Sequence, residues 1–375
     1  MVATFVALTL AAFAPLVQDT TSTFTDSTAL PLSTSIGDTL ADELTEPRGS
    51  GIAYERLFDA FRFDRVQGVS FGLGYRLELP GLAYTTLHGT ARYGISDERL
   101  TGRLSVIRDA PGGRLRVSGY RDIRDVDPLA PGPNLRNTFN ATFTAHDNGD
   151  YALATGGEVS YRTLLGETGL ELEVSARAER EESVRRRASS AVNDWLGGDG
   201  EFSDNPPIDE GTFGGLTARL AGGDRIQWWI AADGLAGAGT ATGRLYGEIR
   251  RDFGEADGVT LRAQGGIATV PTLAQMAFRA GGLATVRGFD YGTQRGQAFW
   301  SAQLDVAPIP ARIRPVAFID AGRSAAARDL FSGRVLVGAG IGLSLLRGAL
   351  RFDLSRRLSP DVATLRFDIV VGGVR

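Results

Sequence analysis

The carboxyl-terminal stretch ATLRFDIVV, residues 363–371, alternates between apolar and polar side chains. Its apolar positions are Leu365, Phe367, Ile369 and Val371, and the polar positions on the opposite face are Thr364, Arg366 and Asp368. Successive side chains of a β-strand point to opposite faces, so this period of two predicts a strand with one apolar and one charged face. A single strand of this kind also suits a soluble β-sandwich. The number of such strands therefore decides between a soluble β-sandwich and a membrane-spanning β-barrel.

Comparable alternation recurs in about sixteen segments between residues 68 and 374. It is clear in ALRFDLS at 349–355, GLELEVSARAE at 169–179 and VTLRAQGGIAT at 259–269. Short breaks separate the segments, and almost no helical periodicity lies between them. Sixteen membrane-spanning strands of about 9–11 residues need roughly 150–175 residues, which this region supplies. We therefore predict an all-β fold for residues 56–375, a transmembrane antiparallel β-barrel of about sixteen strands.

The physics of the bilayer explains this pattern. An unpaired peptide group in hydrocarbon costs several kcal/mol, so strands cross a membrane only in a sheet that closes on itself. Outward side chains are then apolar, whereas inward ones can carry charge because a barrel of this size encloses water. The long breaks at 183–211 and 270–297 follow the seventh and eleventh predicted strands, which places both on one rim. The break at 127–137 falls on the opposite rim in this count.

The amino-terminal region differs in composition. Residues 1–17 are apolar, and Ala12-Phe13-Ala14 offers small residues around a cleavage point, so we expect a segment like a secretory signal peptide. Residues 18–55 form a Thr/Ser/Asp-rich stretch that we expect to be a disordered linker. The first basic residue is Arg48, so a mis-assigned start or a fragment of a longer protein is the alternative. No other segment has about twenty consecutive apolar residues, which predicts no membrane-spanning helix.

Composition argues against several functional classes. The sequence has 40 basic residues, all of them arginine, against 44 acidic residues, and the two signs are interleaved, so we expect no nucleic-acid partner. It contains no cysteine and therefore no thiolate metal site. The two histidines, His88 and His146, are far apart, and no serine lies in a G-x-S-x-G motif. The acid pairs Glu181-Glu182 and Asp209-Glu210 suit solvation better than cation binding. We predict no enzymatic activity, cofactor or metal.

The loop GGLATVRGFDYGTQRG, residues 281–296, carries Arg287 between Val286 and Gly288-Phe289. A guanidinium drawn into a partly desolvated lumen needs a carboxylate, and its planar fork can bind two oxygens at once. Asp320 in FIDAG, 318–322, shares the inward strand face with Arg312, Arg314 and Phe318, whereas Ile313, Ala317 and Ile319 face outward by parity. Gly281, Gly282 and Gly288 allow sharp turns close to the wall. The alternative is that Arg287 is solvated on an external loop.

The segment GAGIGLS, residues 338–344, has the glycine spacing of a nucleotide-binding turn, but no helix follows it. Ala339, Ile341 and Leu343 alternate with glycines, which predicts a strand. We hypothesise that inward glycines such as Gly340 leave room in the lumen for the loop.

The VRGF motif at 286–289 and FIDAG at 318–322, with about eleven strands before the loop and five after it, resemble the bacterial surface-antigen barrel of the BamA/TamA-type outer-membrane protein assembly superfamily. The resemblance implies that the long loop folds into the lumen and that Arg287 meets inward polar residues of the twelfth and thirteenth strands. These are Gln303 in SAQLDV, where the family usually has a glutamate, and Asp320. Residues 61–78 likewise resemble the opening strand of related barrels.

The sequence also departs from that family. About fifty residues precede the predicted barrel, which leaves no room for periplasmic POTRA domains and puts insertase activity in doubt. The sequence ends on Arg375, whereas family members commonly end on an aromatic residue.

The resemblance implies a location in the bacterial outer membrane and a role in outer-membrane protein biogenesis or translocation, with the lateral seam between the first and last strands as the working element. A passive transport pore or structural barrel is the alternative, and a soluble all-β domain or membrane-embedded enzyme is a third class. The implied partners are membrane lipid and lipopolysaccharide, and also other outer-membrane proteins or a periplasmic partner.

Overall fold

The computed structural model describes residues 50–52, 60–129, 135–166, 168–237, 239–254, 258–309, 311, 313–345, 350–359 and 365–371. The chain divides into two units, residues 1–32 and 33–375, and every described residue belongs to the second. The predicted signal-like segment at 1–17 therefore lies outside the described residues, as do Arg312 and the predicted linker at 18–55 apart from 50–52.

The second unit is built on one antiparallel sheet, which has seventeen strands among the described residues. One of them, β1 (Gly51–Ile52), only adds two residues to the edge of β3. The other sixteen are β2 (Phe61–Asp64), β3 (Gly68–Glu78), β4 (Thr85–Gly94), β5 (Leu100–Ala110), β6 (Gly113–Asp125), β7 (Tyr151–Leu164), β8 (Glu171–Ser183), β9 (Gly211–Gly222), β10 (Ile226–Gly237), β11 (Thr240–Phe253), β12 (Val259–Ala268), β15 (Ala298–Val306), β16 (Arg314–Ala325), β17 (Leu336–Leu345), β18 (Leu350–Ser359) and β19 (Arg366–Val371).

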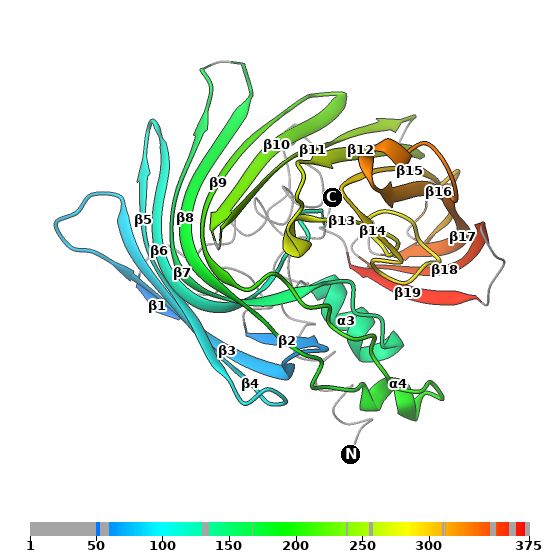
Figure 1. Ribbon diagram of the computed structural model, residues 1–375, viewed down its shortest axis with the longest axis horizontal. Coiled ribbons are helices and arrows are strands. Elements are labelled where there is room, and N and C mark those ends of the chain that lie inside the picture. Colours follow the sequence, from blue (N-terminus) through cyan, green and yellow to red (C-terminus); the bar gives the residue numbers. More distant parts are fainter. Residues whose placement is uncertain are drawn as a thin grey trace. The chain divides into compact units, whose positions relative to one another are not determined.

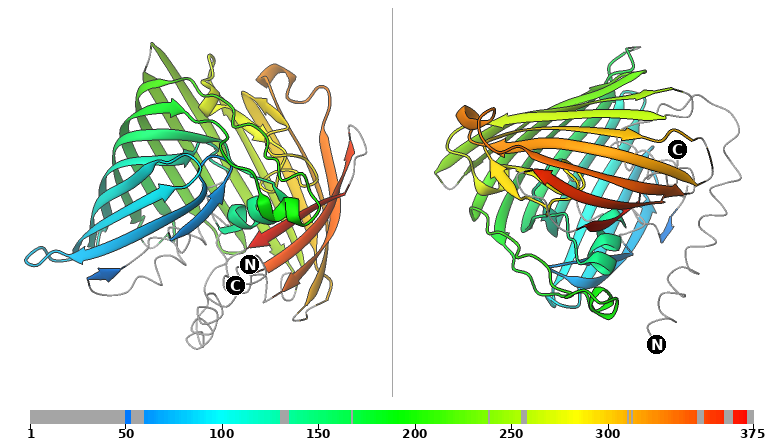
Figure 2. Two further views of the ribbon diagram at one scale, coloured as in Figure 1. Left: turned by 90° about the horizontal axis from the view of Figure 1, so that it is seen from below. Right: turned by 90° about the vertical axis from the view of Figure 1, so that its right-hand side faces the viewer.

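The strands follow an up-and-down path in which each pairs with the strands before and after it in the sheet, and helix α3 (Leu135–Thr144) contacts both the first strand, β2, and the last strand, β19. Figures 1 and 2 show the sheet curving around an interior that the loops enter. The predicted barrel is therefore confirmed. Eleven strands, β2 to β12, precede the glycine-rich loop and five, β15 to β19, follow it, as the sequence predicted.

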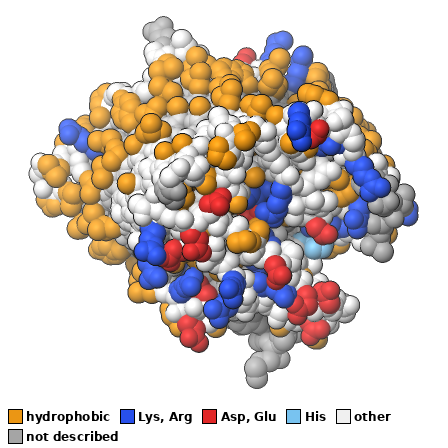
Figure 3. Space-filling model, viewed as in Figure 1, with side chains coloured by type: hydrophobic (Ala, Val, Ile, Leu, Met, Phe, Trp, Pro, Cys, Tyr) orange, Lys and Arg blue, Asp and Glu red, His pale blue; other side chains and the backbone are white. Residues whose placement is uncertain are grey.

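The two faces of the sheet differ in polarity, as the alternation predicted. Leu73, Leu104, Ile249, Ile319 and Leu343 are exposed on the outer face. On the inner face, charged side chains such as Asp233, Glu248, Asp320 and Asp353 are buried. Figure 3 shows apolar side chains gathered along the left and upper margin of the view, with most charged ones over its centre, lower part and right side. An apolar exterior around a polar interior is the side-chain distribution of a membrane barrel.

Two expectations about the first strands were wrong. Residues 61–78 do not form one opening strand but a hairpin, in which β2 and β3 pair with Asp64 opposite Gly68. The Asp64 carboxylate accepts the backbone N–H groups of Val66 and Gln67 at 2.9 and 2.7 Å, which stabilises a tight turn. Counted from β2, the connection 126–150 follows the fifth strand, whereas 184–210 and 269–297 follow the seventh and eleventh, so all three lie on one rim. Residues 127–137 were therefore assigned to the wrong rim.

The long connections carry the remaining elements. Helix α3 (Leu135–Thr144) lies in 126–150 and α4 (Ala191–Trp195) lies in 184–210, whereas the hairpin β13 (Phe278–Ala280) and β14 (Gln294–Gly296) lies in 269–297. The short 3-10 helix η3 (Ala274–Met276) also lies in 269–297, and η4 (Ala327–Asp329) lies in the connection between β16 and β17. None of the helices in the described part of the chain has the length and hydrophobicity that a membrane crossing requires.

Candidate functional site

The connection 269–297, here called the lumen loop, is held against the inner wall by Arg287. Its Nε and one terminal nitrogen donate to Oδ2 and Oδ1 of Asp320 at 2.7 and 2.6 Å, and its backbone N–H donates to the same carboxylate at 2.9 Å. Arg287 is 6% exposed and Asp320 1% exposed, so both charges are buried. A bidentate, desolvated pair of this kind fixes orientation as well as adding attraction.

Further groups surround the same guanidinium. Asp305 on β15 accepts from Arg287 at 2.7 Å, and an Asp353 oxygen on β18 lies 3.7 Å from it. The guanidinium carbon lies 3.8 Å from the centre of the Phe318 ring, a cation–π arrangement. Arg351 bonds to both Asp305 and Asp353, at 2.9 and 2.5 Å. The lumen loop is thus attached to β15, β16 and β18 at one point.

The predicted glycines lie where the backbone requires them. Gly281, Gly282 and Gly288 have φ values of 108°, 89° and 87°, in the left-handed region that side chains rarely adopt. On the wall, a Cβ at Gly338 would collide with the carbonyl oxygen of Arg287, and one at Gly340 with the Phe318 ring. Gly338 therefore leaves space that the loop occupies, whereas Gly340, the glycine expected to do so, leaves space for the Phe318 ring of the neighbouring strand. Val286 and Phe289 pack with Ala280 and Leu336 in a buried cluster beside them.

Gln303 does not take the role expected of it. Its side-chain oxygen accepts from Arg262 at 3.1 Å, and its amide donates to the carbonyl of Leu283 at 3.5 Å, so it contacts the backbone of the loop and not the Arg287 guanidinium. The second carboxylate comes from Asp305, two residues further along the same face of β15. Sequence parity in SAQLDV was the signal that could have identified Asp305. Parity in ALRFDLS likewise put Asp353 on the polar face, but nothing local in the sequence indicated that it lies beside Arg287.

A second charged cluster joins the long connections to one another. Asp150, at the end of 126–150, accepts from Arg279 and Arg295 of the lumen loop at 2.5 and 2.6 Å, and from Arg65 in the β2–β3 turn at 3.3 Å. Burial disfavours the charged form of Asp150, but Arg279, Arg295 and Arg65 together outweigh it and lower the pKa of this carboxyl. Arg65 also bonds to Ser203 in 184–210, at 2.7 Å. All three long connections meet here.

Helix α3 lies between the first and last strands, at the junction that we call the seam (Figures 1 and 2). The backbone N–H of Ile369 on β19 donates to the Asn140 side-chain oxygen at 2.8 Å, and the Asn140 amide donates to the carbonyl of Ile369. On the other side, the backbone N–H of Phe63 on β2 donates to the Thr138 hydroxyl at 3.4 Å. Side chains of one helix thus form hydrogen bonds to strand backbone groups that would otherwise bond to the backbone of a neighbouring strand.

Packing and charge hold α3 at the seam. Ala141 and Ala145 pack against Phe63 and against Phe202 from 184–210. His146, just after the helix, lies 3.2 Å from Asp368 on β19. Arg366 on the same strand bonds to Asp290 of the lumen loop at 2.7 Å. The seam, helix α3 and the lumen loop are therefore connected structurally.

The histidines and acid pairs that could serve catalysis or metal binding do not gather at one site. His88 is buried on β4, far along the chain from His146 at the seam. Glu181 is buried and bonds to Arg124 and Gln275, whereas its neighbour Glu182 is on the exposed face. Asp209 accepts from the backbone of Ala274 at 2.7 Å. Among the described residues, no group of three or more His, Asp and Glu side chains is arranged to hold a metal ion.

No protein-family model and no curated protein matches this chain. Several solved structures do. BamA from Haemophilus ducreyi lacking POTRA domains 1-3 aligns over 90% of this chain and 77% of its own, with 11% identity and a TM-score of 0.54. CdiB from Acinetobacter baumannii (15% identity, TM-score 0.45) aligns over 80% of this chain and 56% of its own. CdiB from Escherichia coli (14% identity, TM-score 0.44) aligns over 86% and 62%.

The alignment with BamA shows that this chain has a barrel of the BamA type at the level of fold. The resemblance read from VRGF and FIDAG is confirmed at that level.

Proposed function

We propose that this protein is a bacterial outer-membrane barrel that assembles or translocates polypeptides at its seam. The fold shared with BamA supports the location and the general role. In this proposal the lumen loop braces the wall beside the seam through Arg287, and helix α3 closes the seam until a client displaces it. Membrane lipid, lipopolysaccharide and other outer-membrane or periplasmic proteins are the partners, and the barrel has no catalytic chemistry of its own.

The observation that carries the proposal is the pairing of the Asn140 side chain with the backbone of Ile369. A strand edge that is not paired with another strand is a template for an incoming extended segment. A backbone segment would satisfy the same N–H and C=O groups along the whole edge, whereas α3 reaches them through one amide and, on β2, one hydroxyl. Exchange of α3 for a client strand would therefore replace a few side-chain hydrogen bonds by a continuous series of backbone hydrogen bonds between strands.

Chemical locking of the seam tests this function. The chain has no cysteine, so cysteines introduced at Asn140 and Ile369 would be the only thiols available to a short bismaleimide crosslinker. In cells depleted of the wild-type protein, we expect both single-cysteine variants to restore assembly of other outer-membrane barrels, measured as the heat-modifiable folded form. We expect the crosslinked double variant to fold but fail to restore assembly. Normal assembly with a locked seam would refute the proposal.

A passive pore is the second candidate, and one observation favours it. A cavity of about 210 Å³ lies on the inner wall, with Glu173, Glu248, Arg219 and Arg262 among its lining side chains. A water-filled, charged interior suits the passage of polar solutes. Conductance in planar bilayers distinguishes the two functions. A pore predicts a large, steady conductance that Arg287→Ala increases, together with normal assembly of other barrels in depleted cells.

A further inference from the structure

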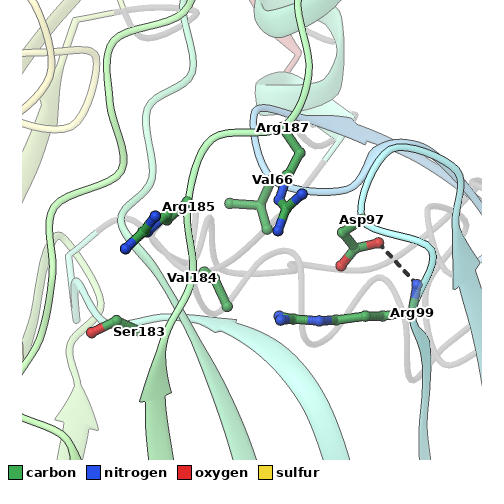
Figure 4. A pocket seen from close by; sticks show the side chains of 7 residues that line it. All are labelled: Val66, Asp97, Arg99, Ser183, Val184, Arg185 and Arg187. Carbon is green, nitrogen blue, oxygen red and sulfur yellow. Dashed lines mark hydrogen bonds between the residues drawn. The ribbon is translucent and has the colours of Figure 1, made fainter.

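A separate cavity lies at the long-loop rim, and no residue of the lumen loop, α3, β2 or β19 lines it. It measures about 180 Å³ and is bounded by the turn at 95–99, by residues 183–187 and by Val66. Three arginines line it, Arg99, Arg185 and Arg187, with Asp97 as the acidic member. Figure 4 shows the side chains of Arg99 and Arg187 approaching the same space from opposite sides. We call this cavity the arginine pocket.

The arginines of the pocket lack acidic partners. Within the described part of the chain, no ion pair joins a carboxylate to the guanidinium of Arg99, Arg185 or Arg187. The neighbouring Arg186, in contrast, pairs with Glu201 and with Asp204, the latter at 3.3 Å. Glu201 and Asp204, on the same connection, are thus paired with Arg186 and not with an arginine of the pocket. Like charges that share a cavity repel one another unless an anion enters.

Asp97 does not supply the missing charge. One of its oxygens accepts the backbone N–H of Arg99 at 3.3 Å, within its own turn. Burial is the largest influence on this carboxyl and raises its pKa, whereas the charge of Arg99 lowers it. Three guanidinium groups against one carboxylate leave the charge around the cavity positive.

The backbone around the pocket is fixed, so the arginines do not rely on a mobile loop for their position. The N–H groups of Arg187 and Ala188 both donate to the carbonyl of Arg65, at 2.9 and 3.2 Å. Arg65 is itself 2% exposed and tied to Asp150. On the other side, Ile95 and Ser96 donate to the carbonyls of Val69 and Gln67, both at 2.9 Å. A pre-positioned site costs less conformational entropy on binding.

We propose that the arginine pocket binds a phosphate group. Guanidinium forks match the oxygens of phosphate in pairs, and two forks from opposite sides can hold one tetrahedral anion. The group has two sources, free phosphate or the phosphate of a lipopolysaccharide. Exposed Ile95 and Leu100 flank the turn that carries Arg99, so this rim presents apolar and cationic groups side by side. An amphipathic phosphorylated lipid needs both.

Binding measurements on the full-length protein in detergent test this site. Inorganic phosphate and lipopolysaccharide are titrated separately by calorimetry in phosphate-free buffer. We expect Arg99→Gln/Arg187→Gln to weaken binding by about tenfold or more, because each charged hydrogen bond is lost. The matched control is Arg225→Gln, which removes an exposed arginine from the 223–225 turn on the opposite rim. Neither pocket arginine belongs to the Arg287 cluster or the seam, so heat-modifiability should stay at the wild-type level.

The outcomes separate the sources. Arginine-dependent binding of both ligands supports a site for the phosphate group itself, and arginine-dependent binding of lipopolysaccharide alone supports the lipid source. Binding that is equal in the double variant and in Arg225→Gln overturns the proposal, and so does the absence of binding to either ligand by the wild-type protein.

Discussion

At the scale of single residues, Arg287 combines several interactions, each of which would contribute little to stability on a solvent-exposed surface. It meets Asp320, Asp305 and Asp353 and lies over Phe318; all of these are buried except Asp305, whose side chain is 28% exposed. Removing one partner of a buried ion pair leaves the others charged and desolvated, which costs more than the pair contributed. The planar fork matters as much as the charge, because it bonds to carboxylates on two different strands.

We therefore expect Arg287→Ala to lower the free energy of unfolding by about 3–5 kcal/mol. Arg287→Lys should recover only part of this, since an ammonium keeps the charge but cannot form the forked contact. Guanidinium-induced unfolding, followed by the gel shift of the folded barrel, measures the difference. Trypsin gives a second readout, because Arg279 in the lumen loop is 2% exposed and becomes cleavable only if the loop leaves the wall. A stable Arg287→Ala variant with Arg279 still protected would contradict this account.

At the scale of elements, α3 is held at the seam by a small number of side-chain contacts. Its bonds to β19 and β2 come from Asn140 and Thr138, and the helix packs through Ala141 and Ala145. Edge strands are otherwise a liability that proteins cover or blunt. A helix that bonds to the backbone groups of an edge strand through its side chains covers that edge, and it can still detach from the strand.

Asn140→Leu should weaken this closure. The change leaves the N–H and C=O groups of Ile369 without their side-chain partner, at a cost of about 1–3 kcal/mol. We expect faster reaction of a cysteine introduced at Ile369 with a water-soluble maleimide. Thr142→Ala is the control, because the Thr142 hydroxyl donates to the backbone carbonyl of Thr138 within the helix. Equal labelling rates in the two variants would show that Asn140 does not close the edge.

At the scale of the whole molecule, the three long connections form one cover on their rim. Asp150 is the shared acceptor for Arg65, Arg279 and Arg295, and Tyr291 of the lumen loop donates to Asp127 of 126–150 at 2.9 Å. Movement of one connection therefore requires the others to adjust. The cover links the β2–β3 turn, helix α3 and the lumen loop.

The Asp150 cluster predicts a specific pH dependence. The pKa of the Asp150 carboxyl lies below the ordinary value of 3.8. The ionised carboxylate therefore contributes its full stabilisation above pH 3.8, and this stabilisation is lost as the pH falls through the lowered pKa of the folded state. We expect bilayer conductance to stay constant from neutral pH to about pH 4 and to rise only in stronger acid. Asp150→Asn should show the raised conductance already at neutral pH. A wild-type rise well above pH 4, or an unchanged variant, would exclude this role.

The sequence by itself determined the barrel, because side-chain alternation is a local property that a single chain displays without any tertiary information. It also located the lumen loop between the eleventh and twelfth strands, and parity put Asp320 on the inward face. The carboxylates that contact Arg287 were harder to predict from the sequence. The family resemblance predicted Gln303 as a partner of Arg287, whereas the carboxylates beside Arg287 include Asp305 and Asp353 as well as Asp320.

Only the tertiary structure decided those partners, because which inward side chain reaches a loop depends on strand register and on the curvature of the wall. The same holds for the seam. No local pattern shows that a helix in the connection after the fifth strand will meet β19 more than two hundred residues later, where Asn140 bonds to Ile369. Alternation fixes the face on which a side chain lies, but closure of the sheet fixes which side chains meet.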